Sequence, residues 1–278
     1  MARSFIQPSP MPGLGLSAGI TLAMLALVVL APIGALLVQG ASLGAEGLWA
    51  EVNRPRVWAA LGLSFRLAAL AAAVNLGLGL VLAWALERYD FPGRRLLDAA
   101  VDLPFALPTA VAGIALTALS APSGAFGALA ARLGGRIAYT EAGIFLALLF
   151  VGLPFVTRTV QPVVAEIDRE LEEASATLGA GRLTTLRRVI WPMLMPAALT
   201  GFALALARGV GEYGSVIFIA GNLPMQTEIA PLLIVIKLEE FDDAGAAAIG
   251  VAMLAISFVM LLAINLLQVW SRRRMGDV

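Results

Sequence analysis

The chain lacks cysteine and histidine altogether and has one lysine among its 278 residues. The missing cysteine excludes disulfides and thiolate chemistry, and the missing histidine excludes imidazole metal ligands and Ser-His catalytic pairs. The lysine, Lys237, does not follow a glycine-rich loop, so the chain has no P-loop phosphate-binding motif. We therefore expect a protein that is not an enzyme, with no metal site and no cofactor of its own. A Ser-Lys pair that uses Lys237 is the one hydrolytic arrangement left open.

Charged residues are scarce as well. They make up 14% of the chain, the formal net charge is zero and the mean hydropathy is +0.89. So little polar surface does not cover a soluble domain of this size, and a neutral chain offers no attraction to a nucleic acid backbone. The composition indicates an all-α, polytopic membrane protein that is surrounded mainly by lipid.

Apolar segments of roughly 20 residues are needed to cross a bilayer, and several approach that length. We expect about six spans, at 16–39, 57–86, 96–121, 141–164, 189–220 and 245–270. Pro104, Pro108 and Pro154 are expected to kink the helices that contain them. The fifth segment is so long that a break near 209–215 would give seven spans, and the sequence leaves both counts open.

Arginines orient these segments. With the amino terminus in the cytoplasm, twelve basic residues fall inside and five outside, as the positive-inside rule requires. The inner set is Arg3, Arg88, Arg94, Arg95, Arg158, Arg169, Arg182, Arg187, Arg188, Arg272, Arg273 and Arg274, and the outer set is Arg54, Arg56, Arg132, Arg136 and Lys237. Both termini are then cytoplasmic. We divide the chain into an amino-terminal tail with the first span and outer loop (1–56), a transmembrane domain (57–270) and a basic cytoplasmic tail (271–278).

One long polar segment, 165–192, separates the fourth and fifth spans. Four apolar residues share one helical face there: Ile167, Leu171, Ala174 and Leu178. Acidic residues gather at the start of this helix, where the helix dipole favours them, and Gly179 predicts the turn that ends it. Pro192 is expected in the first turn of the next span. We predict a helix, a glycine turn and a second helix, all on the cytoplasmic side.

The spacing inside this segment is specific. Glu173-Ala174-Ser175 is followed by three residues and Gly179, then by nine residues and Val189, and Pro192 comes three positions later. This pattern resembles the E-A-A-x3-G-x9-I-x-L-P signature of permease subunits of ATP-binding-cassette (ABC) importers. Serine, valine and tryptophan replace the second alanine, the isoleucine and the leucine.

The resemblance implies that the loop at 172–192 contains a coupling helix, which fits a groove of a separate ATPase and carries its closure into the membrane. The implied ATPase-coupling residues are Glu173, Ala174, Ser175, Gly179, Val189 and Pro192. Any ATP and Mg²⁺ would then be bound by the partner ATPase.

Two longer stretches, 64–116 and 211–258, resemble the T-type (CysT) permease subunits of sulfate/thiosulfate importers. Molybdate permeases share part of this pattern, whereas the stretch 227–231 favours the sulfate branch. The resemblance implies a type I ABC importer permease fold in the bacterial inner membrane. It also implies a homologous second permease subunit, two ATP-binding subunits and a periplasmic sulfate-binding protein as partners. Whether the anion is sulfate, thiosulfate or molybdate, and whether the permease pair is a heterodimer or a homodimer, stays open.

Ionisable residues also lie inside the apolar segments, where a charge costs at least roughly 2.5 kcal/mol. Arg208 and Glu212 are four residues apart. We expect them either to pair along one helix face or, with Tyr213, to line the translocation path. Arg66 is expected to extend to a membrane boundary, and Asn75 to form an interhelical hydrogen bond.

The outer loop at 222–243 carries five acidic residues against Lys237 alone. Such a loop would repel a dianion, so we expect a separate receptor to capture the substrate. The competing hypothesis is an ion-coupled secondary anion transporter that works without an ATPase and uses Glu212 as its proton or sodium site.

Overall fold

The computed structural model of the chain describes residues 14–275, and the side chains of Leu14 and of residues 270–275 are outside that description. Every regular element of the described residues is helical. Arg3 and the side chains of the basic tail predicted at 271–278 therefore lie outside the described residues. The prediction of an all-α chain is confirmed for the rest.

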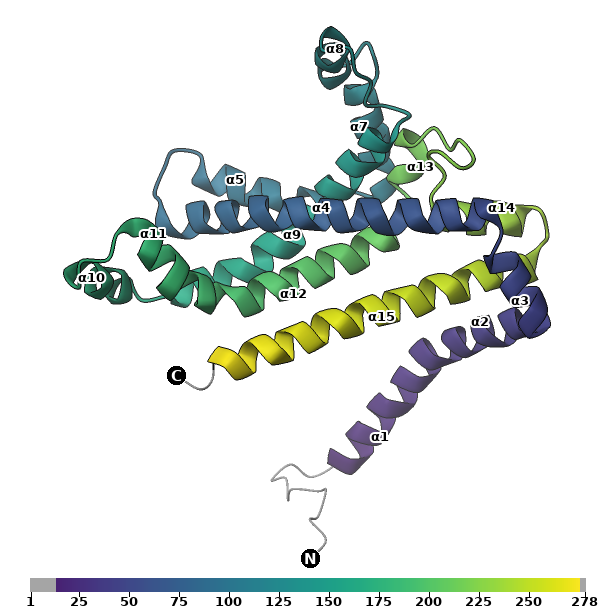
Figure 1. Cartoon of the computed structure of the whole chain (residues 1–278), viewed down its shortest axis with the longest axis horizontal. Coiled ribbons are helices and arrows are strands. Elements are labelled where there is room, and N and C mark those ends of the chain that lie inside the picture. The colour runs from purple at the N-terminus through teal and green to yellow at the C-terminus, as the bar shows by residue number, and fades with distance from the viewer. Residues whose placement is uncertain (1–13, 276–278) are drawn as a thin grey trace, which may run out of the picture.

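Four long helices form the body of the molecule, and Figure 1 shows them running along its long axis. They are α4 (Pro55–Arg88), α9 (Glu141–Glu166), α12 (Trp191–Val210) and α15 (Asp243–Met275). Two short helices lie at one end, α3 (Gly44–Val52) and α14 (Ala230–Glu239), and two at the other, α10 (Arg169–Thr177) and α11 (Arg182–Thr185). We refer to these as the α14 end and the α10 end.

The remaining elements are shorter. They are α1 (Leu14–Leu25), η1 (Ala26–Leu30), α2 (Ala31–Ala41), α5 (Arg94–Val101), α6 (Leu103–Ala106), α7 (Thr109–Ser120), α8 (Ala125–Arg132), η2 (Leu186–Ile190) and α13 (Val216–Ile219). In Figure 1, α7 and α8 project to one side of the bundle and α1 leaves it at an angle, while α2 packs against α15.

The core forms where α4, α9 and α12 pack against one another. Glycines allow this close approach, because a Cβ at Gly79 of α4 would lie 2.6 Å from Cγ1 of Val156, and a Cβ at Gly201 of α12 would lie 2.9 Å from the Val156 Cα. Small residues at helix crossings are typical of packing in membranes, where van der Waals contact rather than water exclusion holds helices together.

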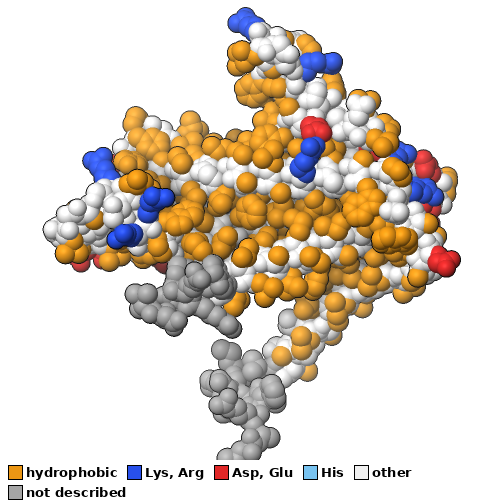
Figure 2. Space-filling view, viewed as in Figure 1, with side chains coloured by type: hydrophobic (Ala, Val, Ile, Leu, Met, Phe, Trp, Pro, Cys, Tyr) orange, Lys and Arg blue, Asp and Glu red, His pale blue; other side chains and the backbone are white. Residues whose placement is uncertain are grey.

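Five helical segments are long and apolar enough to cross a membrane: Gly15–Ala41, Pro55–Arg88, Glu141–Glu166, Arg182–Val210 and Asp243–Val269. A sixth span results if α7 and α8, which bend by 41° at their junction, are taken together. Figure 2 shows hydrophobic side chains covering most of the flank of the bundle between its two ends. The predicted architecture of about six spans is confirmed.

The third span, which was predicted at 96–121, is not a single helix over these residues. This stretch is broken into α5, α6 and α7, and the bent pair α7 and α8 is the candidate crossing. Pro104 lies in the first turn of α6 and Pro108 at the amino-terminal cap of α7, so both prolines separate helices instead of kinking one. Pro154, in contrast, lies inside the continuous helix α9.

The fifth span also differs. The chain does break after Val210, but the helices that follow, α13 and α14, have only four and ten residues, so the described residues contain no seventh crossing there. At its other end, Pro192 lies in the first turn of α12, as predicted, although the continuous helical run begins earlier, at Arg182. The π-helical turn η2 directly before Pro192 changes the hydrogen-bond register where proline lacks an N–H donor.

Candidate functional site

The polar segment folds into a small projection at the α10 end, which we call the α10–α11 knob (168–185). Asp168 caps α10, with its side chain accepting a hydrogen bond of 3.1 Å from the backbone N–H of Glu170. At the other end Gly179 adopts a φ of +80°. The N–H of Gly179 donates to the carbonyl of Ala176, and the N–H of Ala180 donates to that of Ser175. This is the Schellman arrangement, so the predicted helix and glycine turn are confirmed.

The two helices of the knob are joined by one side-chain contact. The Ser175 hydroxyl lies 2.8 Å from the hydroxyl of Thr185, and Thr185 is buried. Glycine at 179 therefore allows the chain to double back, and a pair of hydroxyl groups holds α10 against the start of α11.

The six signature residues divide into three positions. Glu173, Ala174 and Gly179 are exposed on the knob, and Ser175 lies at its internal contact. The two others, Val189 and Pro192, are partly buried in the helical run that leads from the knob into the bundle. They do not converge on one pocket; they mark the tip, the inside and the stem of a single projection.

The apolar face predicted for this segment is split. Ile167 is 3% exposed and packs in the core of the bundle, whereas Leu178 is 87% exposed and Leu171 is 41% exposed. Ile167 therefore anchors the knob, and the other two side chains present apolar surface outward.

Arg88, at the end of α4, attaches the knob to the bundle. Its Nη2 donates to the carbonyl oxygen of Ile167 at 2.9 Å and lies 3.1 Å from Oε1 of Glu172. Its guanidinium also stacks over the ring of Trp84, 5.2 Å from the ring centre. The side chain is 11% exposed, so the contacts are largely screened from solvent.

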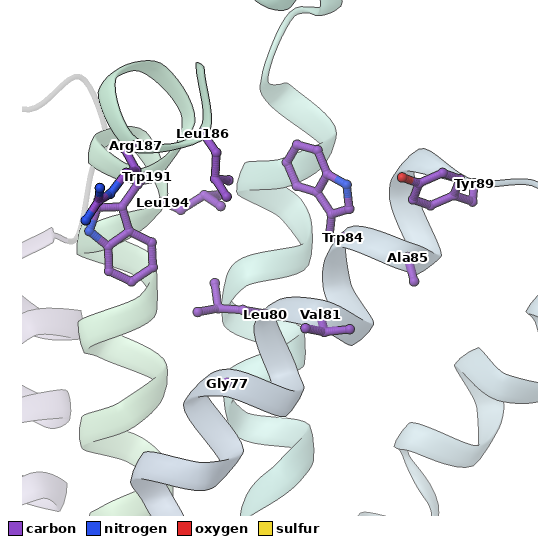
Figure 3. A pocket seen from close by; sticks show the side chains of 10 residues that line it. All are labelled: Gly77, Leu80, Val81, Trp84, Ala85, Tyr89, Leu186, Arg187, Trp191 and Leu194. Atoms are coloured by element: carbon purple, nitrogen blue, oxygen red, sulfur yellow. The ribbon is translucent and has the colours of Figure 1, made fainter. Parts of the chain in front are cut away.

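Beside this attachment a cavity of about 620 Å³ opens between α4 and the η2–α12 run. Figure 3 shows Trp84 and Leu80 on the α4 side and Leu186 and Trp191 on the other. Its lining is mostly hydrophobic, so it offers little to hold an inorganic anion.

At the same end, α5 is tied to α9 through Arg158. The guanidinium of Arg158 binds Oδ1 of Asp98 at 2.6 Å and Oδ2 of Asp102 at 2.7 Å. This hydrogen bond from Arg158 lowers the pKa of Asp98 below its ordinary value. Two acidic groups one turn apart thus fix an amphipathic helix to the bundle.

The charges inside the spans are paired. Nη1 of Arg208 lies 2.5 Å from Oε2 of Glu212. The carboxylate of Glu212 is buried, and its Oε1 accepts hydrogen bonds of 2.8 Å from both the N–H and the hydroxyl of Ser215. The expected pairing of Arg208 with Glu212 is confirmed, but Glu212 lies in the turn after α12 and not on the same helix face, and Tyr213, the next residue, is partly buried.

Arg66 pairs with an acidic residue, whereas Asn75 lacks the partner expected for it. Nη2 of Arg66 donates to Oε2 of Glu141 at 2.7 Å, and both side chains are about half exposed or more, at 61% and 48%. Asn75 is fully buried, and neither of its side-chain polar atoms has a hydrogen-bond partner among the described residues. The expected interhelical hydrogen bond of Asn75 is therefore wrong for this conformation.

At the α14 end, the acidic loop is less repulsive than its composition indicated. Glu228 is buried and receives two hydrogen bonds from Arg56, at 2.8 and 2.7 Å. Lys237 lies 2.6 Å from Asp242 and 3.2 Å from Glu51. Two of the five acidic groups thus have cationic partners, which weakens the predicted repulsion of a dianion.

Two functional features of the knob escaped the sequence analysis. The contact between Ser175 and Thr185 could have been found, because a short glycine turn brings residues on either side of it together. The Arg88 attachment had no such signal, since 79 positions separate Arg88 from Ile167.

Comparison with known proteins gives consistent matches. Residues 75–277 match the family described as binding-protein-dependent transport system inner membrane component. A probable sulfate transport system permease protein cysT of Nephroselmis olivacea is 47% identical over 257 residues, 92% of this chain and 90% of that protein. The sulfate transport system permease protein CysT of Escherichia coli (strain K12) is 45% identical over 258 residues, 93% of each chain.

Solved structures agree in fold. A bacterial ABC transporter involved in the import of the acidic polysaccharide alginate has a chain that matches with a TM-score of 0.74 at 15% identity, covering 94% of this chain and 96% of that one. A chain of the MetNI methionine ABC transporter matches with a TM-score of 0.57 at 18% identity, covering 77% and 94%. At these identities the match supports the architecture of the helices alone.

Proposed function

Because this chain belongs to the inner membrane components of binding-protein-dependent transport systems, and to their CysT-type permeases, we propose that it forms the membrane-spanning path of an ATP-driven importer of sulfate and thiosulfate. The observation that carries the proposal is the similarity, over nearly the whole chain, to proteins described as sulfate transport system permeases. The chain has no P-loop of its own, so the ATP and Mg²⁺ are bound by a partner.

The α10–α11 knob is the proposed contact with that ATPase. Glu173, Ala174 and Gly179 are exposed on it, and Leu178 adds apolar surface next to the glycine turn. Ser175 keeps the two helices of the knob together, and Val189 and Pro192 belong to the stem that leads into α12. A compact projection on a continuous helix suits the transfer of motion from an ATPase to the bundle.

The proposed assembly contains a homologous second permease, two ATP-binding subunits and a periplasmic sulfate-binding protein. The distribution of arginines supports an orientation with the α10 end and both termini in the cytoplasm of a bacterial cell. The α14 end then faces the receptor. Arg208 and Tyr213, both partly exposed, are proposed to border the path, with Glu212 holding Arg208 in position.

The test is uptake of labelled sulfate by cells in which this system is the only sulfate importer. We expect uptake to require ATP and the receptor, and to be inhibited by excess thiosulfate but not by an equal excess of molybdate. Inhibition by molybdate alone would assign the chain to molybdate instead. Uptake by this chain alone in liposomes, driven by a proton or sodium gradient, would contradict the importer and favour the ion-coupled alternative.

A further inference from the structure

Arg66 is placed unusually for a charged residue of a membrane helix. It is the twelfth residue of α4, about 16 Å along the helix from its first residue and about 33 Å from its last at 1.5 Å per residue. The helix is apolar enough to cross a membrane, with a mean hydropathy of 2.0 in its most apolar window. Nevertheless the side chain is 61% exposed. A charge on such a helix is stable only where it faces protein, water or the membrane interface instead of the lipid core.

The bonding of Arg66 is also incomplete. A guanidinium has five N–H donors, and among the described residues only one contact is made, from Nη2 to Glu141. Arg56, in contrast, uses two nitrogens on one buried carboxylate, and Arg158 binds two carboxylates at once. Most of the donors of Arg66 therefore remain free for another acceptor.

The partner of Arg66 is held loosely. Glu141 is the first residue of α9 and its side chain is 48% exposed. Glu212, the acidic partner of Arg208, is 1% exposed and receives two further hydrogen bonds from Ser215. Glu141 is thus free to swing aside on its helix terminus, whereas Glu212 is fixed.

Space adjoins the pair. A cavity of about 340 Å³ is lined by Gly62, Arg66 and Glu141 together with Gln226 of the loop before α14. This space is large enough for several water molecules or for a small anion that keeps part of its hydration shell. Gln226 has a carboxamide, which can donate hydrogen bonds as well.

We propose that Arg66 is an oxyanion-binding residue of the transport path, with Glu141 as the counterion that a tetrahedral dianion displaces. This rests on the proposed function and names a site within it. The guanidinium fork matches two oxygens of such an anion, which makes a stronger contact than the single bond to Glu141. When the anion moves on, Glu141 returns to Arg66 and prevents the site from holding its cargo.

The absence of cysteine permits a direct test that requires no transport. Gly62 lies one helical turn from Arg66 on the same face, and a Cβ there would meet nothing within 4 Å. In the assembled importer, Gly62→Cys should react with both an anionic and a cationic water-soluble methanethiosulfonate reagent, the anionic one faster. Adding Arg66→Ala should slow the anionic reagent by about tenfold but not the cationic one, and adding Glu141→Gln should accelerate the anionic one. Parent complex without the cysteine supplies the background rate.

Failure of this site is distinguishable from failure of the proposed function. No reaction of Gly62→Cys with either charged reagent would mean that lipid or a subunit covers the face, and equal effects of Arg66→Ala on both reagents would mean that no anion-selecting field exists. Either result overturns the site while leaving sulfate uptake untouched.

Measurements of sulfate uptake provide a second test of the site. Arg66→Ala should raise the KM for sulfate about tenfold or more and Glu141→Gln should lower it, because one removes the ligand and the other its competitor. A merely structural ion pair predicts the same loss in both variants, which would contradict the proposal. Arg94→Ala, which removes an exposed pair with Asp90, is the matched control and should leave the KM unchanged. Membrane levels and co-purified subunits are compared in each variant.

Discussion

The α14 end and the α10 end of the bundle are held together in different ways. At the α14 end, Arg56 binds a carboxylate that is 1% exposed, and the Ser64 hydroxyl accepts a hydrogen bond from the Ala230 N–H in the interior. At the α10 end, the knob is attached mainly through Arg88 and is closed by one pair of hydroxyl groups. The first end is a buried clamp, and the second is an exposed projection on a narrow attachment.

The difference predicts how the stability of each end responds to substitutions. The Glu228 carboxylate and the Ser64 contact of the clamp are buried, whereas Arg56 is 40% exposed. Removing the carboxylate leaves Arg56 without its partner at the edge of the interior and lowers stability. The contacts of the knob are also partly buried, but they join only a small projection to the bundle, so their removal should change its shape more than the free energy of unfolding. Substitutions at the α14 end should therefore affect folding, and substitutions at the α10 end should affect transport in a folded protein.

The largest effect is expected from Glu228→Gln. The change removes the ionic partner of Arg56 at the clamp, and we expect the free energy of unfolding to fall by about 1.5–3 kcal/mol. The thermal unfolding midpoint of the purified importer measures it. Glu173→Gln makes the same change on the exposed knob and should leave the midpoint unaltered. Equal midpoints for the two variants would contradict the proposed difference in stability between the two ends.

Gly179→Val should act on transport instead. A φ of +80° disfavours any side chain, at about 1–2 kcal/mol, so the native turn would be populated about five- to thirtyfold less. We expect uptake and ATPase co-purification to fall accordingly, with membrane insertion unchanged.

Gly134 provides a matched control for Gly179. It has a φ of +76°, and a Cβ there would also meet nothing within 4 Å, but it lies in the loop between α8 and α9. If Gly134→Val reduced ATPase co-purification as much as Gly179→Val, the effect would be a general consequence of backbone strain and not a property of the knob.

Ser175→Ala is expected to have a smaller effect. It removes the hydroxyl that contacts Thr185, a contribution of about 0.5–1.5 kcal/mol to the closed knob. Uptake at limiting ATPase concentration should fall a few fold and be restored by excess ATPase. Thr184→Ala, on the exposed neighbouring position, should leave uptake unchanged.

The smallest effect is a pH dependence at the α14 end. The hydrogen bond from Lys237 and, to a smaller extent, the hydrogen bond from the N–H of Gly245 lower the pKa of Asp242 below its ordinary value of 3.8. The ionised carboxylate therefore stabilises the fold above about pH 4, and this contribution is lost as the pH falls through the lowered pKa. Unfolding midpoints from pH 6 downward should decline slightly more for the parent than for Asp242→Asn. Parallel curves for the two proteins would mean that Lys237 gives no net stabilisation here.

Local patterns in the sequence predicted local structure well. The apolar run at 141–164 became α9, and Gly179 became the left-handed turn, because hydropathy and backbone freedom are properties of the residues themselves. Pro192 lies in the first turn of α12 as predicted, but the extension of the helical run back to Arg182 through a π-helical turn was not predicted. The break of 96–121 was missed, because Asp98 and Asp102 are held by Arg158, which lies 56 or more positions away.

In the candidate site, too, only the features that depend on local sequence could be predicted. The knob has a signature of fixed spacing within one loop, so its residues could be identified directly. Arg66 and Glu141 are 75 positions apart, and their pairing depends on how α4 and α9 cross. No local pattern carries that information, so the sequence alone did not predict this pair.

The unbroken helical run from Arg182 to Val210 has a mechanical consequence. At 1.5 Å per residue it is a shaft of about 42 Å that starts in the knob and ends beside Arg208 and Glu212. Backbone hydrogen bonds continue through the π-helical turn, so a torque applied at the knob reaches the far end of α12 without passing through a loop. The segment from α5 to α7, interrupted twice, has no such stiffness and behaves as a set of separate joints.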